Sequence, residues 1–202
     1  MLAAPRVPVA PADSATRRAQ AGALKEEGNA LAKAGKKADA CIKYEEGMCT
    51  LGVPPFGGML ELPDEQRAAA LQALDGATRE LLSTLASNAA QMYLDPDATQ
   101  FGDGLNLAVE MCSAALEANP SNAKAYFRRA SALYERADGG GKMANEMLAL
   151  AQIDIQKFLQ TDPQNSAARQ LQQRIRESMD PVHNSISASP LHAAPAPSAP
   201  AA

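Results

Sequence analysis

The sequence is poor in aromatic residues, which make up 4% of its 202 residues and include no tryptophan. Alanine, in contrast, supplies about a fifth of the chain. Alanine is the strongest helix former and a weak strand former. With 46% hydrophobic residues, the chain can still bury one core of ordinary size. The composition therefore favours a single domain of packed helices over a sheet protein.

Histidine is nearly absent, and both histidines, His183 and His192, lie in a Pro-, Ala- and Ser-rich segment near the end of the chain. The rest of the chain therefore lacks the residue needed for Ser-His-Asp or Cys-His catalysis, and a zinc site is disfavoured. The cysteines, Cys41, Cys49 and Cys112, are odd in number and have no Cys-x-x-Cys spacing. We expect reduced thiols that pack between helices, and no catalytic residue, metal site or cofactor.

An excess of basic charge is also missing, because 19 basic residues face 23 acidic ones and the net charge is -4. A general nucleic-acid binder needs a basic surface, so that function is disfavoured. No stretch approaches the roughly 20 apolar residues of a membrane span, and the N-terminus has no apolar run typical of a signal peptide. We therefore expect a cytoplasmic protein, whose oligomeric state the sequence leaves open.

Proline-rich segments flank the helical part of the chain. Residues 1–13 carry three prolines, and residues 181–202 combine five prolines with alanine and serine. Neither segment can bury enough apolar surface to fold alone. We expect disordered tails around a domain spanning residues 14–180. The tails would also suit linkers to parts of a longer protein.

Apolar residues recur at helical spacing through most of residues 14–180. We expect helices over residues 15–34, 37–49, 64–94, 105–118, 122–137, 143–161 and 165–179. The pair Asp75-Gly76 either breaks the third of these helices or only bends it. Proline and glycine predict loops at residues 51–63, 95–104 and 137–142.

Two joints between the expected helices share one pattern. Residues 119–122 read Asn-Pro-Ser-Asn and residues 162–165 read Asp-Pro-Gln-Asn. In each, the proline ends one helix and the final asparagine can cap the next. A small residue, Ala108 or Ala151, stands twelve positions before each proline. The recurrence indicates a repeated helix-turn-helix unit.

These features are similar to those of the tetratricopeptide repeat, a helix-turn-helix unit of about 34 residues. The resemblance divides the chain into units of about residues 21–54, 83–122 and 123–165. In the first unit, Gly28 and Ala40 match the small residues that let the two helices approach. The resemblance implies an all-α, right-handed superhelix of three units, with a capping helix at residues 165–179. An insertion, residues 55–82, either forms an extra helix or lengthens the first helix of unit two.

The first helix of each unit carries hydrogen-bond donors at matching places. Lys25 and Asn29 are four residues apart and share one helix face, as do Lys124 and Arg128. Asn88 lies in the corresponding helix of unit two. Because the first helices line the concave groove of such a superhelix, all five side chains are expected to face it. Charge-assisted donors on rigid helices suit the paired carboxylates at a peptide's C-terminus.

With these residues, the chain resembles the co-chaperone tetratricopeptide domains that have a two-carboxylate clamp. That family holds the C-terminal Glu-Glu-Val-Asp of the Hsp90 and Hsp70 chaperones, and all five clamp residue types match. The resemblance implies that Lys25, Asn29, Asn88 and Lys124 hold the last residue's two carboxylates, and that Arg128 binds further along the peptide. It also implies a non-enzymatic adaptor, without settling which of the two chaperones is preferred.

The sequence also predicts where several residues around the five donors lie. Ala32, Gln91 and Ser131 lie one helical turn beyond them and are expected to line a pocket for the peptide's next apolar side chain. Arg129 is expected to face a neighbouring helix or solvent. Four further residues fit core positions and are assigned no binding role: Tyr44, Tyr126, Ile155 and Phe158.

Two other functions fit the same repeats. The protein could be a scaffold that binds another protein through its groove or through residues 55–82. It could also be the targeting module of a larger enzyme, such as an immunophilin-type prolyl isomerase. The insertion bears on the choice, because the clamp geometry depends on how units one and two are placed.

Overall fold

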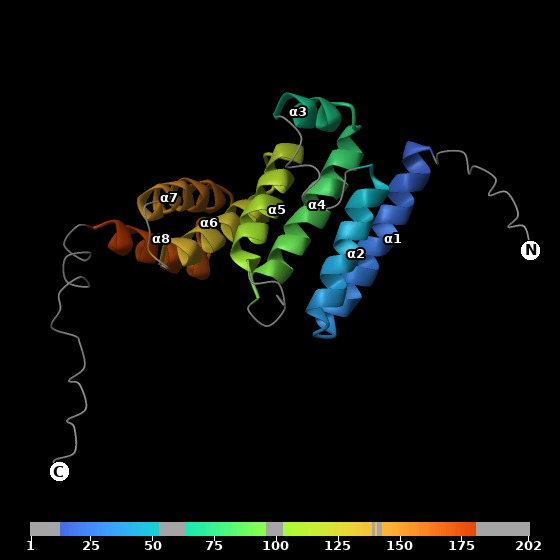
Figure 1. Ribbon diagram of the computed structural model, residues 1–202. Coiled ribbons are helices and arrows are strands. Elements are labelled where there is room, and N and C mark those ends of the chain that lie inside the picture. The colour runs from blue at the N-terminus through green and yellow to red at the C-terminus, as the bar shows by residue number, and fades with distance from the viewer. Residues whose placement is uncertain (1–12, 53–63, 96–102, 139, 141–142, 181–202) are drawn as a thin grey trace, which may run out of the picture.

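Helices account for nearly all of the chain that the computed structural model describes, which is residues 13–52, 64–95, 103–138, 140 and 143–180 (Figure 1). In order they are α1 (Ser14–Lys33), α2 (Lys37–Thr50), α3 (Asp64–Gln72), α4 (Gly76–Tyr93), α5 (Gly104–Ala118), α6 (Ala123–Asp138), α7 (Ala144–Thr161) and α8 (Ser166–Met179). No strand occurs within those residues. The predicted tails, apart from Asp13, lie outside the described residues, as do most of the predicted loops.

The predicted helix over residues 64–94 is in fact two helices, because Asp75 starts a new one. Its side chain accepts a hydrogen bond from the backbone N–H of Thr78 at 2.9 Å, which is the geometry of an N-cap. Both alternatives for residues 55–82 are therefore partly right. The segment contains the separate helix α3 and also the first turns of α4. In Figure 1, α3 lies across the upper ends of α4 and α5.

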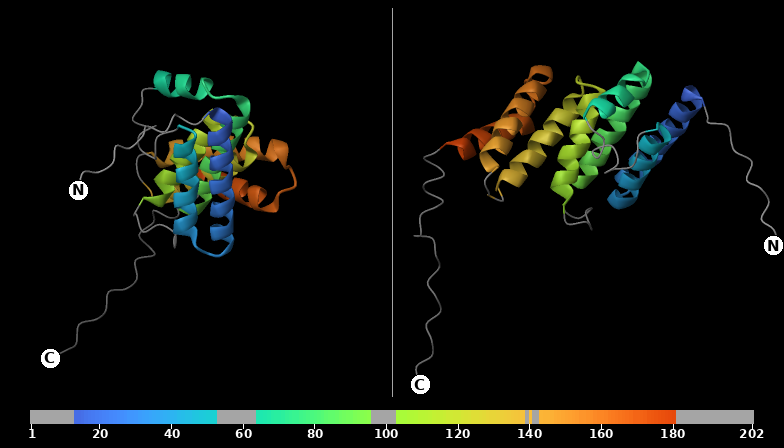
Figure 2. Two further views of the ribbon diagram at one scale, coloured as in Figure 1. Left: turned by 90° about the vertical axis from the view of Figure 1, so that its right-hand side faces the viewer. Right: turned by 45° about the horizontal axis from the view of Figure 1, so that its top comes forward.

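The helices stack as pairs along the chain. Helix α1 packs against α2, α4 against α5 and α6 against α7, while α2 contacts α4 and α5 contacts α6 (Figures 1 and 2). The first helices of successive pairs also touch, α1 with α4 and α4 with α6. Helix α8 then covers α7 and reaches α6. This is the predicted all-α stack of three helix-turn-helix units with a final capping helix.

Small residues lie where the helices meet, as the repeat pattern predicted. The predicted residues Ala40, Ala108 and Ala151 have no exposed surface, and neither have Ala90, Ala115 and Ala130 at the other contacts. Gly28 is needed for a stricter reason. A Cβ atom there would lie 2.6 Å from Cε1 of Tyr44, so only glycine allows α1 and α2 to approach this closely.

The core forms two clusters. The first lies mainly among α1, α2, α4 and α5, with Leu71 of α3 and Ala125 of α6, and the second lies among α6, α7 and α8. Tyr44 and Ile155 lie within them as predicted, whereas Tyr126 and Phe158 are only partly buried. Among the cysteines, Cys49 is exposed, so its predicted packing role is wrong. Its position on α2 points it away from both clusters.

The predicted caps form, and one of them also links two units. Asn122 accepts a hydrogen bond from Ala125 N at 3.2 Å, and Asn165 accepts one from Ala168 N at 3.1 Å. The Nδ2 of Asn122 in addition donates to Ser83 Oγ on α4 at 2.9 Å. The start of α6 is thereby fixed against α4.

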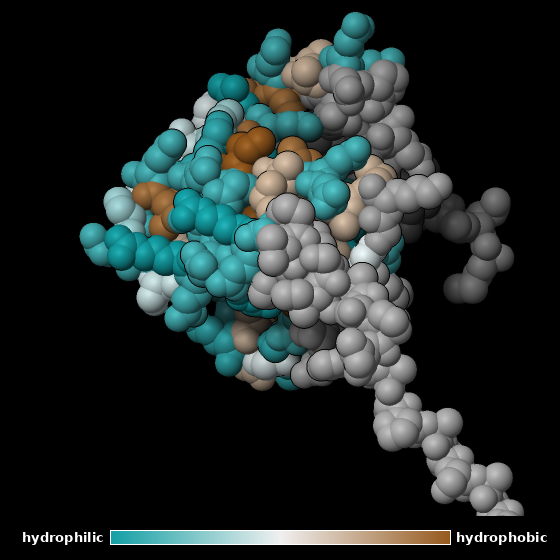
Figure 3. Space-filling model, turned by 90° about the vertical axis from the view of Figure 1, so that its left-hand side faces the viewer, coloured by the Kyte–Doolittle hydropathy of each residue, from teal (hydrophilic) through white to brown (hydrophobic). Residues whose placement is uncertain are grey.

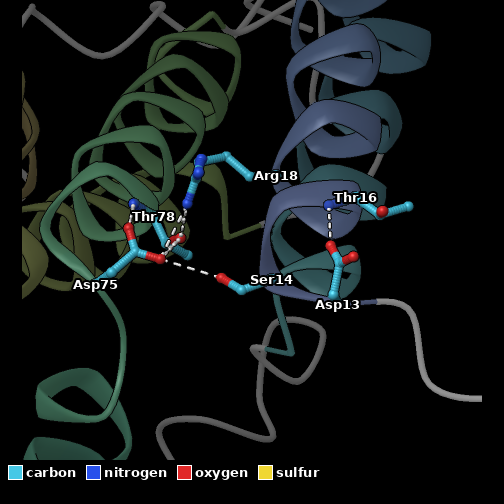
Figure 4. Close-up of polar contacts among 6 residues, drawn as sticks. All are labelled: Asp13, Ser14, Thr16, Arg18, Asp75 and Thr78. Carbon is cyan, nitrogen blue, oxygen red and sulfur yellow. Dashed lines mark hydrogen bonds and ion pairs between the residues drawn. The ribbon is translucent and has the colours of Figure 1, made fainter.

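A polar cluster fixes the start of α1 against the start of α4 (Figure 4). Oδ2 of Asp75 accepts hydrogen bonds from Ser14 Oγ and from Arg18 Nη1, each at 3.0 Å. Hydrogen bonds from Thr78, then from Ser14, and the charge of Arg18 lower the pKa of Asp75 to about 2. The carboxylate is thus ionised at neutral pH and ties unit one to unit two across the insertion.

The end of the stack formed by α7 and α8 is mostly hydrophilic in Figure 3, with hydrophobic groups among the described residues that face the viewer. The exposed large apolar side chains of these two helices are Leu150 and Ile153 on α7 and Met179 on α8. The mostly hydrophilic surface agrees with a polar helix closing the open end of the repeats. None of the described helices is both long and apolar enough to cross a membrane.

Candidate peptide-binding groove

The five predicted donors lie on three neighbouring helices, the first helix of each pair. Lys25 and Asn29 belong to α1, Asn88 to α4, and Lys124 and Arg128 to α6. Four of them are half-buried, and Lys124 is exposed. Since α1 contacts α4 and α4 contacts α6, the helices that carry these donors are adjacent. We call these five residues the clamp set, and the side of α1, α4 and α6 that carries them the groove side.

Asn29 and Asn88 are in direct contact. Nδ2 of Asn88 donates to Oδ1 of Asn29 at 3.4 Å, and the hydroxyl of Tyr44 donates to the same oxygen at 3.0 Å. Because Oδ1 accepts both donors, the Asn29 amide is held with Nδ2 pointing the other way. That Nδ2 donates to Glu26 at 3.1 Å. The amide of Asn29 is therefore oriented as a donor by its two neighbours.

Arg128 lies beside Asn88 because it binds the residues around it on α4. Its Nη1 donates to the backbone oxygen and to Oγ of Ser87, at 2.7 and 2.6 Å. Its Nε donates to Oε1 of Gln91 at 3.0 Å. These contacts hold the guanidinium over one turn of α4, next to the Asn29–Asn88 pair.

The acceptors that Arg128 uses are all uncharged. Burial lowers the pKa of Arg128, with the thiol of Cys112 and the phenol of Tyr44 acting in the opposite direction. A guanidinium nevertheless stays protonated in proteins at neutral pH. No carboxylate of the described residues forms an ion pair with it. Its positive charge is thus positioned on the groove but not neutralised there.

The two lysines differ in their surroundings. Nζ of Lys25 lies 2.9 Å from Oε1 of Glu26, its neighbour in sequence. Lys124 stands one turn before Arg128 on α6, and its ammonium has no ion-pair partner among the described residues. Among the described residues, neither positive charge on the groove side of α6 has a carboxylate within ion-pair distance.

Three side chains in this arrangement were not predicted to belong to it. Ser87 holds Arg128, Tyr44 orients Asn29, and Glu26 contacts both Lys25 and Asn29. Glu26 could have been found from its position next to Lys25 and three residues before Asn29 on the same helix. The roles of Tyr44 and Ser87 depend on other helices, and the sequence pattern holds no sign of them.

A cavity of about 660 Å³ continues from Arg128 between α4, α5 and α6. Of the three residues expected to line a peptide pocket, Gln91 and Ser131 border this cavity, whereas Ala32 packs at the edge of the first core cluster. The other lining residues are Tyr93, Leu94, Asp103, Gly104, Leu105, Phe127, Glu135 and Arg136. The walls are thus apolar, with charged groups among them.

Arg129 is on the other side of α6, as predicted, and makes a buried ion pair. Its Nε and Nη2 donate to the two oxygens of Asp154 on α7, at 2.7 and 2.9 Å. Its Nη1 also donates to Ser113 on α5 at 3.1 Å. Burial alone would lower the pKa of Arg129, but the hydrogen bond and charge of Asp154 raise it. Arg129 thus links α5, α6 and α7.

Metal chemistry has no evident place in this arrangement. Within the described residues, no three His, Cys, Asp or Glu side chains are grouped so as to hold a metal ion. The groove instead presents amide, ammonium and guanidinium donors.

Comparisons with known proteins give the fold. No family model matches the chain. A bovine peptidyl-prolyl cis-trans isomerase, FKBP4, is 32% identical over 165 residues, which cover 80% of this chain. The chain spans only 30% of the length of that relative.

Two solved structures have the same arrangement of helices. One is the C-terminal TPR-containing domain of a putative FK506-binding protein from Plasmodium falciparum, with 18% identity and a TM-score of 0.60 over 86% of this chain and 97% of that one. The other is the first TPR of Spaghetti (RPAP3) bound to the HSP90 peptide SRMEEVD, with 23% identity and a TM-score of 0.53 over 80% and 97%. The protein described here has the tetratricopeptide repeat fold.

Proposed function

We propose that this protein is a non-enzymatic adaptor that binds the C-terminal Glu-Glu-Val-Asp of Hsp90 or Hsp70 through the clamp set. One observation supports this most strongly. Asn29 and Asn88 contact each other across α1 and α4, and Arg128 binds the residues next to Asn88 across α4 and α6. Donors from all three units thus lie along one line of contacts.

The chemistry of these donors suits a ligand with several carboxylates. Lys25, Lys124 and Arg128 supply three positive charges, and charge-assisted hydrogen bonds are about twice as strong as neutral ones. The net charge of -4 does not oppose this, because a concave, partly buried surface strengthens its local field. The peptide would also be steered by charge, so its affinity should fall with salt.

The cavity beyond Arg128 offers space for a side chain of the peptide that precedes its terminal residues. Phe127 and Leu105 give it apolar walls, and Gln91 and Ser131 stand where it meets the clamp set. We propose that it accepts an apolar side chain of the peptide.

The test is a titration with the peptide Ser-Arg-Met-Glu-Glu-Val-Asp. We expect a Kd of about 1–10 µM. Amidation of the peptide's C-terminus should abolish binding because it removes the terminal carboxylate charge. Lys124→Ala combined with Arg128→Ala should do the same because it removes two of the three positive charges of the clamp set. A matched control, Lys36→Ala with Arg176→Ala, removes the same charge from exposed positions outside the clamp set and should bind normally. Equal affinity for the amidated peptide would contradict the clamp.

Titrating a Hsp70 tail alongside would decide between the two chaperones. If neither tail bound and a pull-down recovered an unrelated partner, a scaffold for another protein would be favoured instead.

A second proposal is that this chain acts as the targeting part of an immunophilin-type prolyl isomerase. The 32% identity to FKBP4 over 165 residues favours it. Since the chain spans 30% of that relative, any isomerase activity would reside in sequence beyond the matched part. Determining the full reading frame would test this, because an adjoining isomerase domain is required.

We propose a cytoplasmic setting for either role. The three cysteines are free thiols, as is usual in a reducing compartment. Fluorescence microscopy of a tagged protein would test it.

A further inference from the structure

The carboxylate of Glu26 already sits on two donors of the clamp set. Its Oε1 lies 2.9 Å from Nζ of Lys25, and its Oε2 accepts a hydrogen bond from Nδ2 of Asn29 at 3.1 Å. Each oxygen thus takes one donor. A carboxylate of a bound peptide would use the same two groups in the same way.

The contact with Asn29 is imposed by the helices around it. Tyr44 and Asn88 both donate to Oδ1 of Asn29, so the amide must present Nδ2 on its other side. Glu26 stands one turn earlier on α1 and meets that Nδ2. The hydrogen bonds from Lys25 and then from Asn29 lower the pKa of Glu26, so its carboxylate is ionised at neutral pH.

We infer that Glu26 is a built-in competitor of the peptide carboxylate and sets the affinity of the unit-one half of the groove. This rests on the proposed function. A peptide carboxylate reaches Lys25 and Asn29 only when the Glu26 carboxylate turns away into solvent. Binding in unit one then exchanges one carboxylate for another, so these two donors add little net binding free energy.

Among the residues that the structure describes, no carboxylate competes in this way on the groove side of α6. Lys124 is exposed without an ion-pair partner among the described residues, and Arg128 binds only uncharged oxygens. The affinity should therefore depend more on Lys124 than on Lys25, although both are lysines of the same clamp set.

Glu27 offers a matched control. It follows Glu26 in sequence and is also exposed, but its carboxylate lies 3.5 Å from Nζ of Lys43 on α2. Removing either charge changes the overall charge by the same amount. Only Glu26→Gln frees donors of the clamp set.

The experiment titrates the Ser-Arg-Met-Glu-Glu-Val-Asp peptide into the unmodified protein, Glu26→Gln and Glu27→Gln at low salt. Exposed ion pairs contribute little, so Glu26→Gln should tighten binding by about two- to fivefold, and Glu27→Gln by less than about twofold. Lys25→Ala should cost less affinity than Lys124→Ala, and the cost of Lys25→Ala should grow in the Glu26→Gln background. An affinity of Glu26→Gln equal to or weaker than that of Glu27→Gln would overturn the inference.

A second measurement follows Glu26 itself by carbon NMR of its side-chain carboxyl. Its pKa should rise toward the ordinary value when peptide is added, because the peptide takes over Lys25 and Asn29. An unchanged pKa in the peptide-saturated protein would contradict the exchange. Failure of the unmodified protein and Glu26→Gln alike to bind would overturn the proposed function and this inference with it. Binding without any effect of Glu26 would overturn only the inference.

Discussion

The two sides of α6 use neighbouring arginines in opposite ways. On the groove side, Arg128 donates to a backbone oxygen, a hydroxyl and an amide oxygen, all uncharged. On the core side, Arg129 donates with two nitrogens to the buried carboxylate of Asp154. The residues are adjacent in sequence, yet about 100° of helix rotation directs them to different partners.

The difference shows what separates a binding arginine from a structural one. Neutral acceptors fix the position of Arg128 and leave its charge available to a ligand. The carboxylate of Asp154 neutralises Arg129, so that charge has no further use outside the core. Both arginines therefore make hydrogen bonds to the protein. They differ in that the acceptors of Arg128 are uncharged and the acceptor of Arg129 on α7 is a carboxylate.

Breaking the core side should have the largest effect. Asp154→Ala leaves the Arg129 charge half-buried without its carboxylate, and removing one partner of a buried pair costs about 3 kcal/mol in the free energy of unfolding. Urea denaturation would measure this loss. Peptide affinity should stay within about twofold at temperatures where the variant is folded.

The paired variant Arg129→Leu with Asp154→Leu serves as its control, because apolar replacement of both partners removes the uncompensated charge. It should recover most of the lost stability. A loss below about 1 kcal/mol for Asp154→Ala would mean that Arg129, like Arg128, needs no carboxylate partner, and the contrast between the two sides would fail.

Breaking the groove side should instead spare stability and cost affinity. Arg128→Ala removes an unneutralised charge from the clamp set, so peptide binding should weaken at least about tenfold, or about 1.4 kcal/mol. Its free energy of unfolding should fall by less than that of Asp154→Ala. Calorimetric titration would measure the peptide affinity, and urea denaturation of the same sample would measure the free energy of unfolding.

Arg128→Lys refines this result. Lysine keeps the charge but cannot bridge Ser87 and Gln91 as a planar guanidinium does. An intermediate affinity is expected. If Arg128→Ala bound peptide normally and unfolded as easily as Asp154→Ala, Arg128 would be a structural residue like its neighbour.

The smallest effect is expected at Tyr44, whose ring belongs to the core and whose hydroxyl acts on the groove. Tyr44→Phe removes one of the two donors that orient Asn29, while Asn88 keeps the other. We expect peptide affinity to fall by about two- to threefold, with less than about 1.5 kcal/mol lost in unfolding free energy.

Tyr134→Phe is the matched control for Tyr44→Phe. Tyr134 is also buried in the core, but it contacts Arg174 through its ring and lies outside the clamp set. Its affinity for the peptide should not change. Equal peptide affinities of the two variants would show that the Tyr44 hydroxyl is not needed to orient the Asn29 amide.

Much of the groove was predictable because helices impose fixed local spacings. The four-residue steps from Lys25 to Asn29 and from Lys124 to Arg128 already required each pair to share a face. The position of Ala32 could not be predicted in the same way. One turn beyond Asn29 it faces the core cluster rather than the cavity, because the cavity is bounded by α4, α5 and α6 and not by α1.

The sequence by itself determined the helices, their caps, the small residues at the contacts between them and the kinds of donor that the first helices carry. These follow from local spacing and intrinsic preference. The tertiary structure decided that Asp75 joins α1 to α4 across the insertion, that Asn29 presents its amide nitrogen, and that Arg128 rather than Arg129 keeps a free charge. Those outcomes depend on hydrogen bonds between residues of different helices, up to 61 positions apart. Only the packing of the helices brings such groups within reach of each other.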